Sequence, residues 1–300
     1  MTELRAGGTD LSERRRSGVS TGPIADIGYR PELLRVDRAA DGTTRIGALV
    51  PMATVASDPD LRAGYPGLAA AAGGLATPQI RRVGTIGGNL LQRNRCWYYR
   101  NPGTSCLKKG GSDCPARAGN HRYHVLFDLG PCVAPHPSTL GAALLAYGAG
   151  VETDRRRLTV GEVFGDGSDG TRDHRLEPGE LLTAVTLPPP VPGERAAYFR
   201  AISRTYAEWP LVEAVVRLTV HDGLVTSAAI AVGGVAPVPL RLPAAEAALR
   251  GQPPTAEAFA AAGTAATEGA NPLPQTGFKL ALLAGTVAET LQRAAAVREP

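Results

Sequence analysis

Two glycine-rich segments of this sequence have the composition of loops that bind a diphosphate. The first is Ala6-Gly7-Gly8-Thr9-Asp10, and the second is Thr85-Ile86-Gly87-Gly88-Asn89. Because glycine lacks a Cβ atom, main-chain N–H groups in such loops can approach a diphosphate closely, and a following Thr or Asn adds a side-chain donor. One such loop is more often a tight turn, but two of them, each after small or apolar residues, favour a shared diphosphate site.

The four cysteines all lie in one segment that follows the second loop. They are Cys96, Cys106, Cys114 and Cys132, with the spacing C-x9-C-x7-C-x17-C, in a stretch that has little periodicity. A single cysteine is usually a buried apolar residue, but four in one aperiodic stretch indicate a shared metal site. Zinc sites usually have paired C-x2-4-C ligands, which this spacing lacks, and iron–sulfur clusters tolerate wider gaps. The spacing therefore leaves both metals open.

Basic residues and two histidines accompany the cysteines. Five cations are expected to offset the negative charge of the thiolates: Arg93, Arg95, Arg100, Lys108 and Lys109. His121 and His124 form the only histidine pair at metal-ligand spacing. Because the thiolates compete for the same metals, we expect both imidazoles to face solvent.

A third glycine motif is not expected to bind a nucleotide. Residues 165–170 match G-x-G-x-x-G letter for letter, but the charged residues 171–174 follow them. That fingerprint requires a buried strand before it and a helix that opens at its end. Asp166 and Asp169 would also repel a diphosphate, so the segment is predicted to be a flexible loop. The sequence has neither G-x-S-x-G nor H-E-x-x-H, so hydrolytic chemistry has no candidate.

Short strands and helices must position these residues. Strands are predicted at residues 4–6, 24–27, 45–50 and 181–187, and helices at 68–76 and 138–148, the latter capped by Ser138. After the prolines 188–190, strands are predicted at 196–202, 212–220 and 225–232, with Asp222-Gly223 as a hairpin turn. Helices are predicted at 244–250, 255–267 and 279–297. We expect a first domain at 1–180, with a Cys-rich insert at about 93–133, and a second α+β domain at 181–300.

Composition limits the function classes that fit this chain. It has 300 residues, 43% of them hydrophobic, a formal charge of +4 and a pI near 9.0. The arginine triplets have no interleaved aromatic residues, so a nucleic-acid surface is poorly supported, and an anionic ligand or acidic partner explains the excess charge as well. No apolar run is long enough to cross a membrane, and residues 1–5 do not read as a secretory signal. We therefore expect a cytoplasmic protein with reduced thiols.

Four segments resemble the FAD-binding medium subunit of molybdenum hydroxylases, the family of xanthine dehydrogenase and carbon monoxide dehydrogenase. They are residues 6–11, 80–90, 95–100 and 136–138. The resemblance covers nearly the whole chain and is closest to the flavin subunit of bacterial aldehyde oxidoreductases, which carries a [4Fe-4S] cluster after the second glycine loop. It implies an α+β fold with a two-part, PCMH-like FAD-binding domain, followed by a smaller α+β domain of antiparallel strands and helices.

The resemblance also implies roles for single residues. Ala6, Gly7, Gly8, Thr9 and Asp10 would hold the FAD diphosphate from one side, and Thr85, Gly87, Gly88 and Asn89 from the other. Ser138 would lie near the ribityl or diphosphate part, Leu182 would contact the flavin, and Arg200 would lie near the isoalloxazine. Cys96, Cys106, Cys114 and Cys132 would bind the [4Fe-4S] cluster. Thr139 replaces the usual acidic residue, and only residues 1–5 precede the first loop, so the first subdomain is expected to be incomplete or to start upstream.

The function implied by the resemblance is electron transfer within a complex. A large molybdopterin-binding subunit would oxidise the substrate, a small [2Fe-2S] subunit would pass on the electrons, and FAD held by this chain would deliver them to an external acceptor. The complex is expected in the cytoplasm, or in the periplasm only if it is exported with a partner subunit. Two alternatives stay open: a stand-alone FAD oxidoreductase of the same fold, and a non-catalytic scaffold stabilised by zinc.

Overall fold

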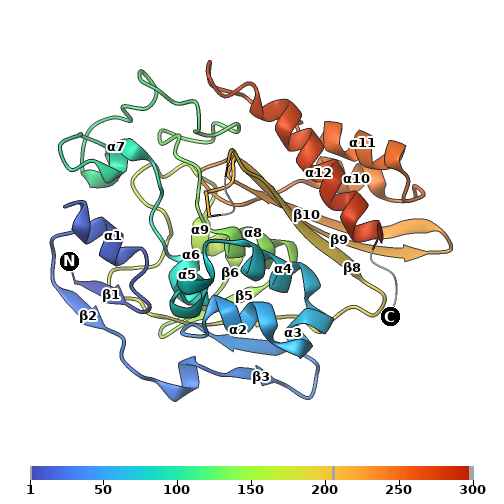
Figure 1. The fold of residues 1–300 in the computed structure, drawn as a ribbon, viewed down its shortest axis with the longest axis horizontal. Coiled ribbons are helices and arrows are strands. Elements are labelled where there is room, and N and C mark those ends of the chain that lie inside the picture. The colour runs from blue at the N-terminus through green and yellow to red at the C-terminus, as the bar shows by residue number, and fades with distance from the viewer. Residues whose placement is uncertain (1, 205–206, 297–300) are drawn as a thin grey trace.

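Three β-sheets organise the chain, which a computed structural model describes over residues 2–204 and 207–296 (Figure 1). Strands β1 (Glu3–Arg5) and β2 (Ile24–Asp26) form a parallel pair. The second sheet has the antiparallel order β3-β4-β7-β5-β6, with β3 (Val36–Arg38), β4 (Thr44–Gly47), β5 (Gly150–Thr153), β6 (Arg157–Thr159) and β7 (Leu182–Leu187). The third has the antiparallel order β11-β10-β9-β8, with β8 (Arg195–Ala201), β9 (Val212–His221), β10 (Leu224–Gly233) and β11 (Leu240–Arg241).

Helices cover these sheets and connect their strands. They are α1 (Leu11–Arg16), α2 (Met52–Ser57), α3 (Pro59–Gly64), α4 (Pro66–Gly74), α5 (Pro78–Val83), α6 (Ile86–Leu90), α7 (Trp97–Arg100), α8 (Thr139–Ala146), α9 (Val160–Phe164), α10 (Pro243–Leu249), α11 (Ala256–Ala265) and α12 (Lys279–Ala296). Proline begins α3, α4, α5 and α10, where the helix needs no N–H donor. Ser138 caps α8 as predicted, because its Oγ accepts a 2.9 Å hydrogen bond from the Gly141 N–H.

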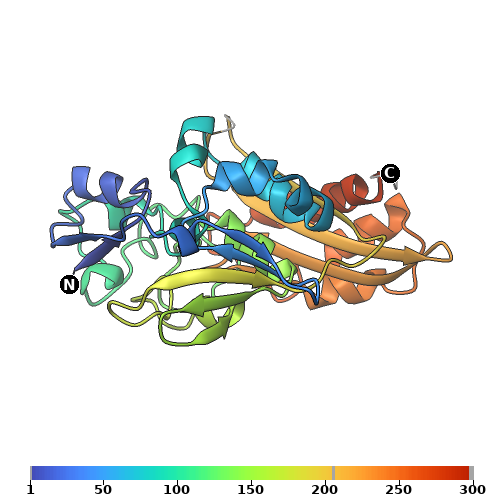
Figure 2. The same ribbon diagram turned by 90° about the horizontal axis from the view of Figure 1, so that it is seen from below.

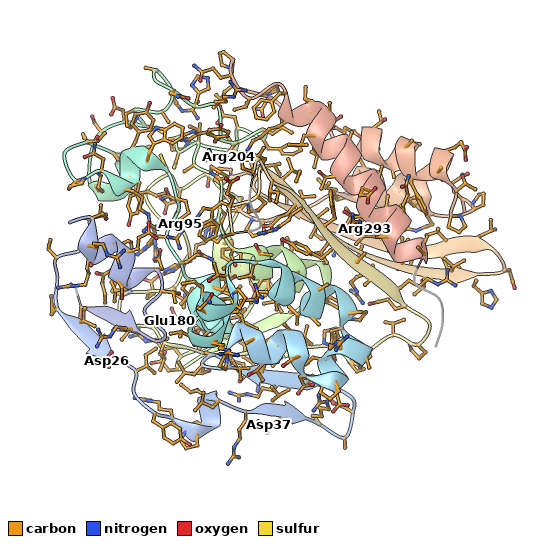
Figure 3. All side chains as sticks on the ribbon, in the orientation of Figure 1. Asp26, Asp37, Arg95, Glu180, Arg204 and Arg293 are labelled. Atoms are coloured by element: carbon orange, nitrogen blue, oxygen red, sulfur yellow. The ribbon has the colours of Figure 1, made fainter. Side chains whose placement is uncertain are left out.

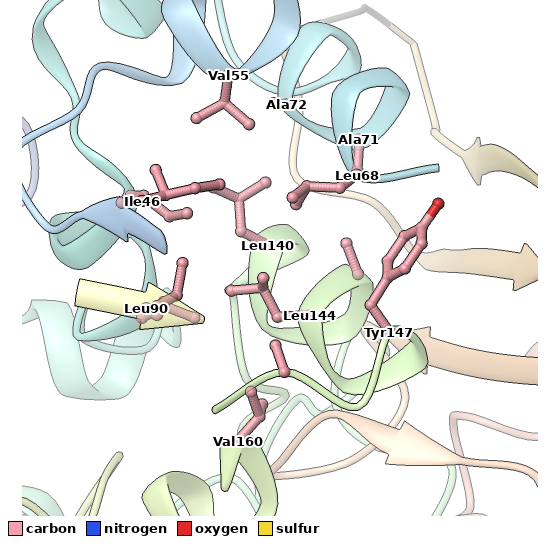
Figure 4. Packing of buried hydrophobic residues seen from close by; sticks show 14 of the residues in the cluster. Ile46, Val55, Leu68, Ala71, Ala72, Leu90, Leu140, Leu144, Tyr147 and Val160 are labelled. Atoms are coloured by element: carbon pink, nitrogen blue, oxygen red, sulfur yellow. The ribbon is translucent and has the colours of Figure 1, made fainter. Parts of the chain in front are cut away.

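Two apolar cores lie on opposite faces of the third sheet. Side chains alternate across a strand, so Val215 of β9 joins the first core and its neighbour Val216 joins the second. The first core also contains Leu68 of α4 and Leu140 of α8, which Figure 4 shows in one cluster with residues of the second sheet. The second core is closed by α10, α11 and α12. Figure 2 shows α2 to α4 as a layer beside the third sheet. The first core contains Leu68 of α4 and Val215 of β9, so the two layers pack against each other.

The Cys-rich segment is a long irregular connection between α7 and α8. Its only helical turn is a 3₁₀ turn at Leu107–Lys109, within the described residues. Arg117 holds it together through a bidentate pair with Asp128, with Nη–Oδ distances of 2.9 and 2.6 Å. The C-terminal domain adds contacts: the His121 N–H donates to Gln275 Oε1, and Asn271 Nδ2 donates to the Asp128 carbonyl. Hydrogen bonds to the other domain therefore order a segment that the sequence left without periodicity.

The α+β class and the order of a mixed domain followed by antiparallel strands and helices are confirmed. β7 pairs with β4 and β5, and β8 begins the third sheet, so the change of sheet falls between Leu187 and Arg195. The turn between β9 and β10 has positive φ at Asp222 and Gly223, as predicted for a hairpin. Residues 165–170 form a loop, as predicted, and Val297, the last residue of the predicted terminal helix, lies outside the described residues. In residues 2–204 and 207–296, every helix is too short or too polar to span a bilayer.

Candidate functional site

Both glycine loops line one cleft, as expected if they share a ligand. The cleft is open to solvent and contains about 710 Å³ of space when the open mouth is included. Nine of the predicted cofactor-binding residues line it: Ala6, Gly7, Gly8, Thr9, Asp10, Thr85, Gly87, Gly88 and Leu182. Leu49, Leu91 and Leu181 add apolar wall, which suits a ligand with an aromatic part.

Close packing between the two loops explains several of their glycines. A Cβ atom on Gly7 would lie 1.9 Å from the Val83 carbonyl oxygen, at the end of α5. A Cβ atom on Gly84 would meet the Met52 side chain at 2.5 Å and the Thr9 hydroxyl at 3.5 Å. Gly8 has φ of +70°, which only glycine adopts readily. The first loop therefore packs against Val83 and Gly84, which directly precede the second loop.

The main-chain donors of the two loops are used differently. In the second loop, the Gly87 N–H donates to the Ala48 carbonyl at 3.0 Å, and the Gly88 N–H donates to Thr85 Oγ1 at 3.0 Å. In the first loop, the N–H groups of residues 6–10 donate to no acceptor within the described part of the chain. A diphosphate in the cleft would therefore find free amides in the first loop and at Thr85, whose N–H also has no acceptor within the described residues. The second loop supplies space and the Thr85 side chain.

Two predicted cofactor-binding residues, Asn89 and Ser138, are buried outside the cleft lining. Ser138 Oγ donates to Asn89 Oδ1 at 2.8 Å, and the Leu140 N–H donates to the same oxygen at 3.2 Å. These bonds join α6, at the second loop, to the first turn of α8. Asn89 and Ser138 bind each other. Direct contact of either residue with a cofactor stays a prediction.

Arg200 also does not line the cleft. It lies in β8, is 9% exposed, and donates from Nη1 to the Glu208 carbonyl at 3.3 Å. Its cross-strand neighbour Glu213 accepts hydrogen bonds from Tyr198 (2.8 Å) and Thr139 (2.9 Å). Burial raises the pKa of Glu213 to about 7. Sequence reasoning missed Glu213, although an acid between Val212 and the apolar residues 214–216 was a usable signal. The placement of Arg200 beside an isoalloxazine stays a prediction.

The Asp10 carboxylate is held by three arginine side chains and one main-chain N–H group. Oδ1 lies 2.8 Å from Arg100 Nη2 and 3.0 Å from Arg95 Nη2, and Oδ2 lies 3.0 Å from Arg14 Nε. The Arg93 N–H donates to Oδ2 at 3.2 Å. Burial alone would raise the pKa of Asp10, but the arginines outweigh it and lower that pKa.

The four cysteines are free thiols, and Cys114 and Cys132 are in contact with each other. Cys96 Sγ lies 3.3 Å from His124 Nε2, and burial, with smaller contributions from Cys106 and Cys114, raises the pKa of Cys96 to about 11. A hydrogen bond from Cys132 lowers the pKa of Cys114 to about 6, and the same contact raises that of Cys132. Among the residues that the structure describes, no three Cys, His, Asp or Glu side chains converge as on a single metal ion.

The surroundings of the thiols differ from the sequence prediction in two ways. His121 and His124 are 4% and 2% exposed, so the prediction that they face solvent is wrong; His121 is covered by its bonds to Gln275. Most of the nearby cations have other partners: Lys108 Nζ lies 3.0 Å from Asp173 Oδ1 in a buried pair, and Arg95 and Arg100 bind Asp10. Lys108 still lowers the pKa of Cys132, so part of the expected charge compensation is present.

Comparison with known proteins gives a consistent result. Residues 2–190 match the family model described as the FAD binding domain in molybdopterin dehydrogenase, and residues 197–294 match the CO dehydrogenase flavoprotein C-terminal domain. The chain is 34% identical to the aldehyde oxidoreductase FAD-binding subunit PaoB of Escherichia coli (strain K12), over 97% of this chain and 91% of that protein.

Other relatives and solved structures agree with this result. The nicotinate dehydrogenase FAD-subunit of Eubacterium barkeri is 27% identical over 85% of this chain and 74% of its own length. The structure of carbon monoxide dehydrogenase from Hydrogenophaga pseudoflava, a form without the Mo-pyranopterin moiety, superposes with a TM-score of 0.76 at 26% identity. That match covers 98% of this chain and 90% of the other.

Proposed function

The chain belongs to the FAD-binding subunits of the molybdenum hydroxylases, and from this premise we propose that it holds FAD in the cleft between its two glycine loops. The observation that carries the proposal is the set of unpaired N–H groups at residues 6–10, in a loop that lines the same cleft as Thr85. Such amides suit a diphosphate, and the missing Cβ atom of Gly7 lets the loop that carries them pack tightly against the Val83 carbonyl at the end of α5. The residues present therefore fit the group.

Each part of the chain has a role in this proposal. The free amides of the first loop bind the diphosphate, and the Thr85 side chain orients it from the second loop. Leu182 and its neighbours shield the apolar part of the cofactor from water. Asn89 and Ser138 fix α6 against α8 and so hold the second loop in place. Bound FAD would accept electrons from one partner and deliver them to another.

We also propose that the four cysteines hold a [4Fe-4S] cluster. Cys96, Cys106, Cys114 and Cys132 are all free thiols on one irregular segment, and Cys114 and Cys132 are in contact. A cluster binds each thiolate to a different iron, so its ligands stand farther apart than those of one zinc ion. Free thiols also fit a cytoplasmic location.

The chain would act as the middle member of a complex. PaoB is named as a subunit of an aldehyde oxidoreductase, and several relatives are named as medium chains or subunits. By analogy, a large molybdopterin subunit oxidises the substrate, a small [2Fe-2S] subunit relays electrons, and this chain passes them to an external acceptor. Membership of the family excludes a non-catalytic scaffold as the role of the whole chain. A stand-alone FAD oxidoreductase has no catalytic Ser/Glu pair to support it.

Two measurements on the purified chain test these proposals separately. After reconstitution with FAD, absorbance should show bound flavin; a chain that stays colourless and leaves free FAD fluorescence unquenched would disprove the cleft assignment. Iron and acid-labile sulfide in equal amounts are expected for the cluster. Zinc in place of iron, with flavin still bound, would disprove the cluster alone.

A further inference from the structure

Asp10 is the last residue of the first glycine loop. Its carboxylate binds three donors from the segment after the second loop and one from helix α1. Arg95 and Arg100 both bind Oδ1, at 3.0 and 2.8 Å, and the Arg93 N–H binds Oδ2 at 3.2 Å. Arg14, from its own helix α1, binds Oδ2 at 3.0 Å. The Asp10 side chain is 13% exposed, so these bonds lie mostly out of water.

The arginines that bind Asp10 also shape the turn around Cys96. Arg100 Nε donates to the Asn94 carbonyl at 2.9 Å, and its Nη2 donates to the Arg93 carbonyl at 2.9 Å. The Cys96 N–H donates to Asn94 Oδ1 at 3.0 Å. Residues 93–100 are therefore a turn with its own hydrogen bonds, and Asp10 is its anchor on the cleft side.

Arg95 extends this connection further. Its Nη2 donates to Gln92 Oε1 at 3.0 Å, and Gln92 lines the cleft just after the second loop. Its guanidinium also lies 4.4 Å from the ring centre of Trp209, in the C-terminal domain. Figure 3 shows Arg95 between α1 and the irregular segment. The cleft, the cysteine turn and the C-terminal domain thus meet at one cation.

A carboxylate in this position is better suited to hold the protein together than to bind the cofactor. Four donors already use its oxygens, and a bare carboxylate would repel a diphosphate. Three arginine side chains neutralise the Asp10 carboxylate. The paired carboxylate then fixes the end of the loop whose amides are free. Whatever fixes residues 6–10 also restrains residues 93–100, because both are attached to the same two oxygens.

We propose that Asp10 is a positioning residue that couples FAD binding in the cleft to the order of the Cys96 turn. The inference rests on the proposed FAD site but not on which metal the cysteines hold. Coupling between two sites is reciprocal, so FAD should stabilise residues 93–100 by the same factor by which an ordered turn improves FAD affinity. A factor of about ten lies within the usual range for such coupling.

Hydrogen exchange of the full-length chain, with and without FAD, measures this coupling. In the wild type, FAD should slow exchange of the 93–100 amides about tenfold. Asp10→Asn keeps the shape but replaces one acceptor with an NH₂ group that faces other donors, so it should abolish that protection and weaken FAD binding about tenfold. Asp26→Asn is the matched control, because it removes an exposed ion pair with Arg5, which also lines the cleft. It should change neither value more than twofold.

A second variant separates coupling from simple damage. Arg100→Gln removes the bond to Asp10 together with the bonds of Arg100 to the Asn94 and Arg93 carbonyls, and Arg100 does not line the cleft. Because the turn loosens, the coupling should weaken FAD binding several-fold although the cleft keeps its lining. Wild-type FAD affinity in Arg100→Gln would overturn the proposal, as would undiminished FAD protection of residues 93–100 in Asp10→Asn. If the wild type shows no flavin binding at all, the proposed function fails instead. If it binds FAD but the turn is unprotected, only the coupling fails.

Discussion

Gly7→Ala should separate the shape of the cleft from the stability of the fold. The new Cβ atom would lie 1.9 Å from the Val83 carbonyl oxygen and 2.8 Å from the Val83 carbonyl carbon, both of them main-chain atoms that cannot rotate away. Ordinary contact begins near 3.4 Å, so the first loop must move by about 1.5 Å. Overpacking of this kind costs about 1–3 kcal/mol of folding stability.

The same movement determines the loss of affinity. A main-chain N–H that bonds a phosphate oxygen at about 2.9 Å would be left beyond hydrogen-bonding range after such a shift. One hydrogen bond to a charged group is worth about 1.5–3 kcal/mol, so FAD should bind about 10- to 150-fold more weakly.

Titration of the apoprotein with FAD, followed by quenching of flavin fluorescence, gives the dissociation constant, and thermal unfolding shows whether the variant remains folded. Gly285→Ala is the matched control, because no atom lies within 4 Å of its added Cβ and the position is an exposed one in α12. It should bind FAD like the wild type. A folded Gly7→Ala protein with wild-type affinity would refute the argument that this loop must lie against α5.

Three further predictions concern other parts of the chain. Cys106→Ser should lose iron and acid-labile sulfide but keep FAD, as measured by metal analysis and absorbance; retained iron would remove Cys106 from the ligand set. Glu213→Gln should flatten the pH dependence of folding stability. Burial raises the pKa of the folded Glu213 carboxyl from 4.5 to about 7, so the wild type loses stability, on the order of 3 kcal/mol, as the pH rises through that window. Thermal unfolding of both proteins at pH 5 and pH 8 should show the difference. Asp173→Asn should destabilise the chain by about 3–5 kcal/mol in chemical denaturation, because it leaves the Lys108 ammonium buried without its partner, and Lys108→Met in the same chain should recover part of the loss.

Local chemistry made much of the fold predictable. Ser138 was recognisable as a helix cap, and Asp222-Gly223 as a hairpin turn, because each depends on its own side chain or φ angle and on residues within one turn. The paired glycine loops also signalled their cleft, since Gly7 and Gly84 are needed wherever two backbones approach closely. The strands predicted at 4–6 and 24–27, on either side of the first loop, are present as Glu3–Arg5 and Ile24–Asp26.

Contacts between distant residues were not predictable in the same way. Arg95 and Arg100 were expected to serve the thiolates, but Asp10, far away in the sequence, takes both. His121 and His124 were expected in solvent, because nothing near them in the sequence reveals that Gln275 would cover His121 or that Trp97 and Tyr98 would pack on His124. One sequence records the types of charged residues but not their pairing, which depends on how the two domains pack.

The unequal use of main-chain donors in the two glycine loops has a kinetic consequence. In the second loop the Gly87 and Gly88 N–H groups are already bonded within the protein, so ligand binding should cost less conformational entropy there. The N–H groups of residues 6–10 have no such partners within the described residues, so a phosphate would have to order that stretch. Substitutions at residues 6–10 should therefore mainly change the dissociation rate of FAD. Substitutions at residues 85–89 should mainly change the folding stability of the FAD-free protein.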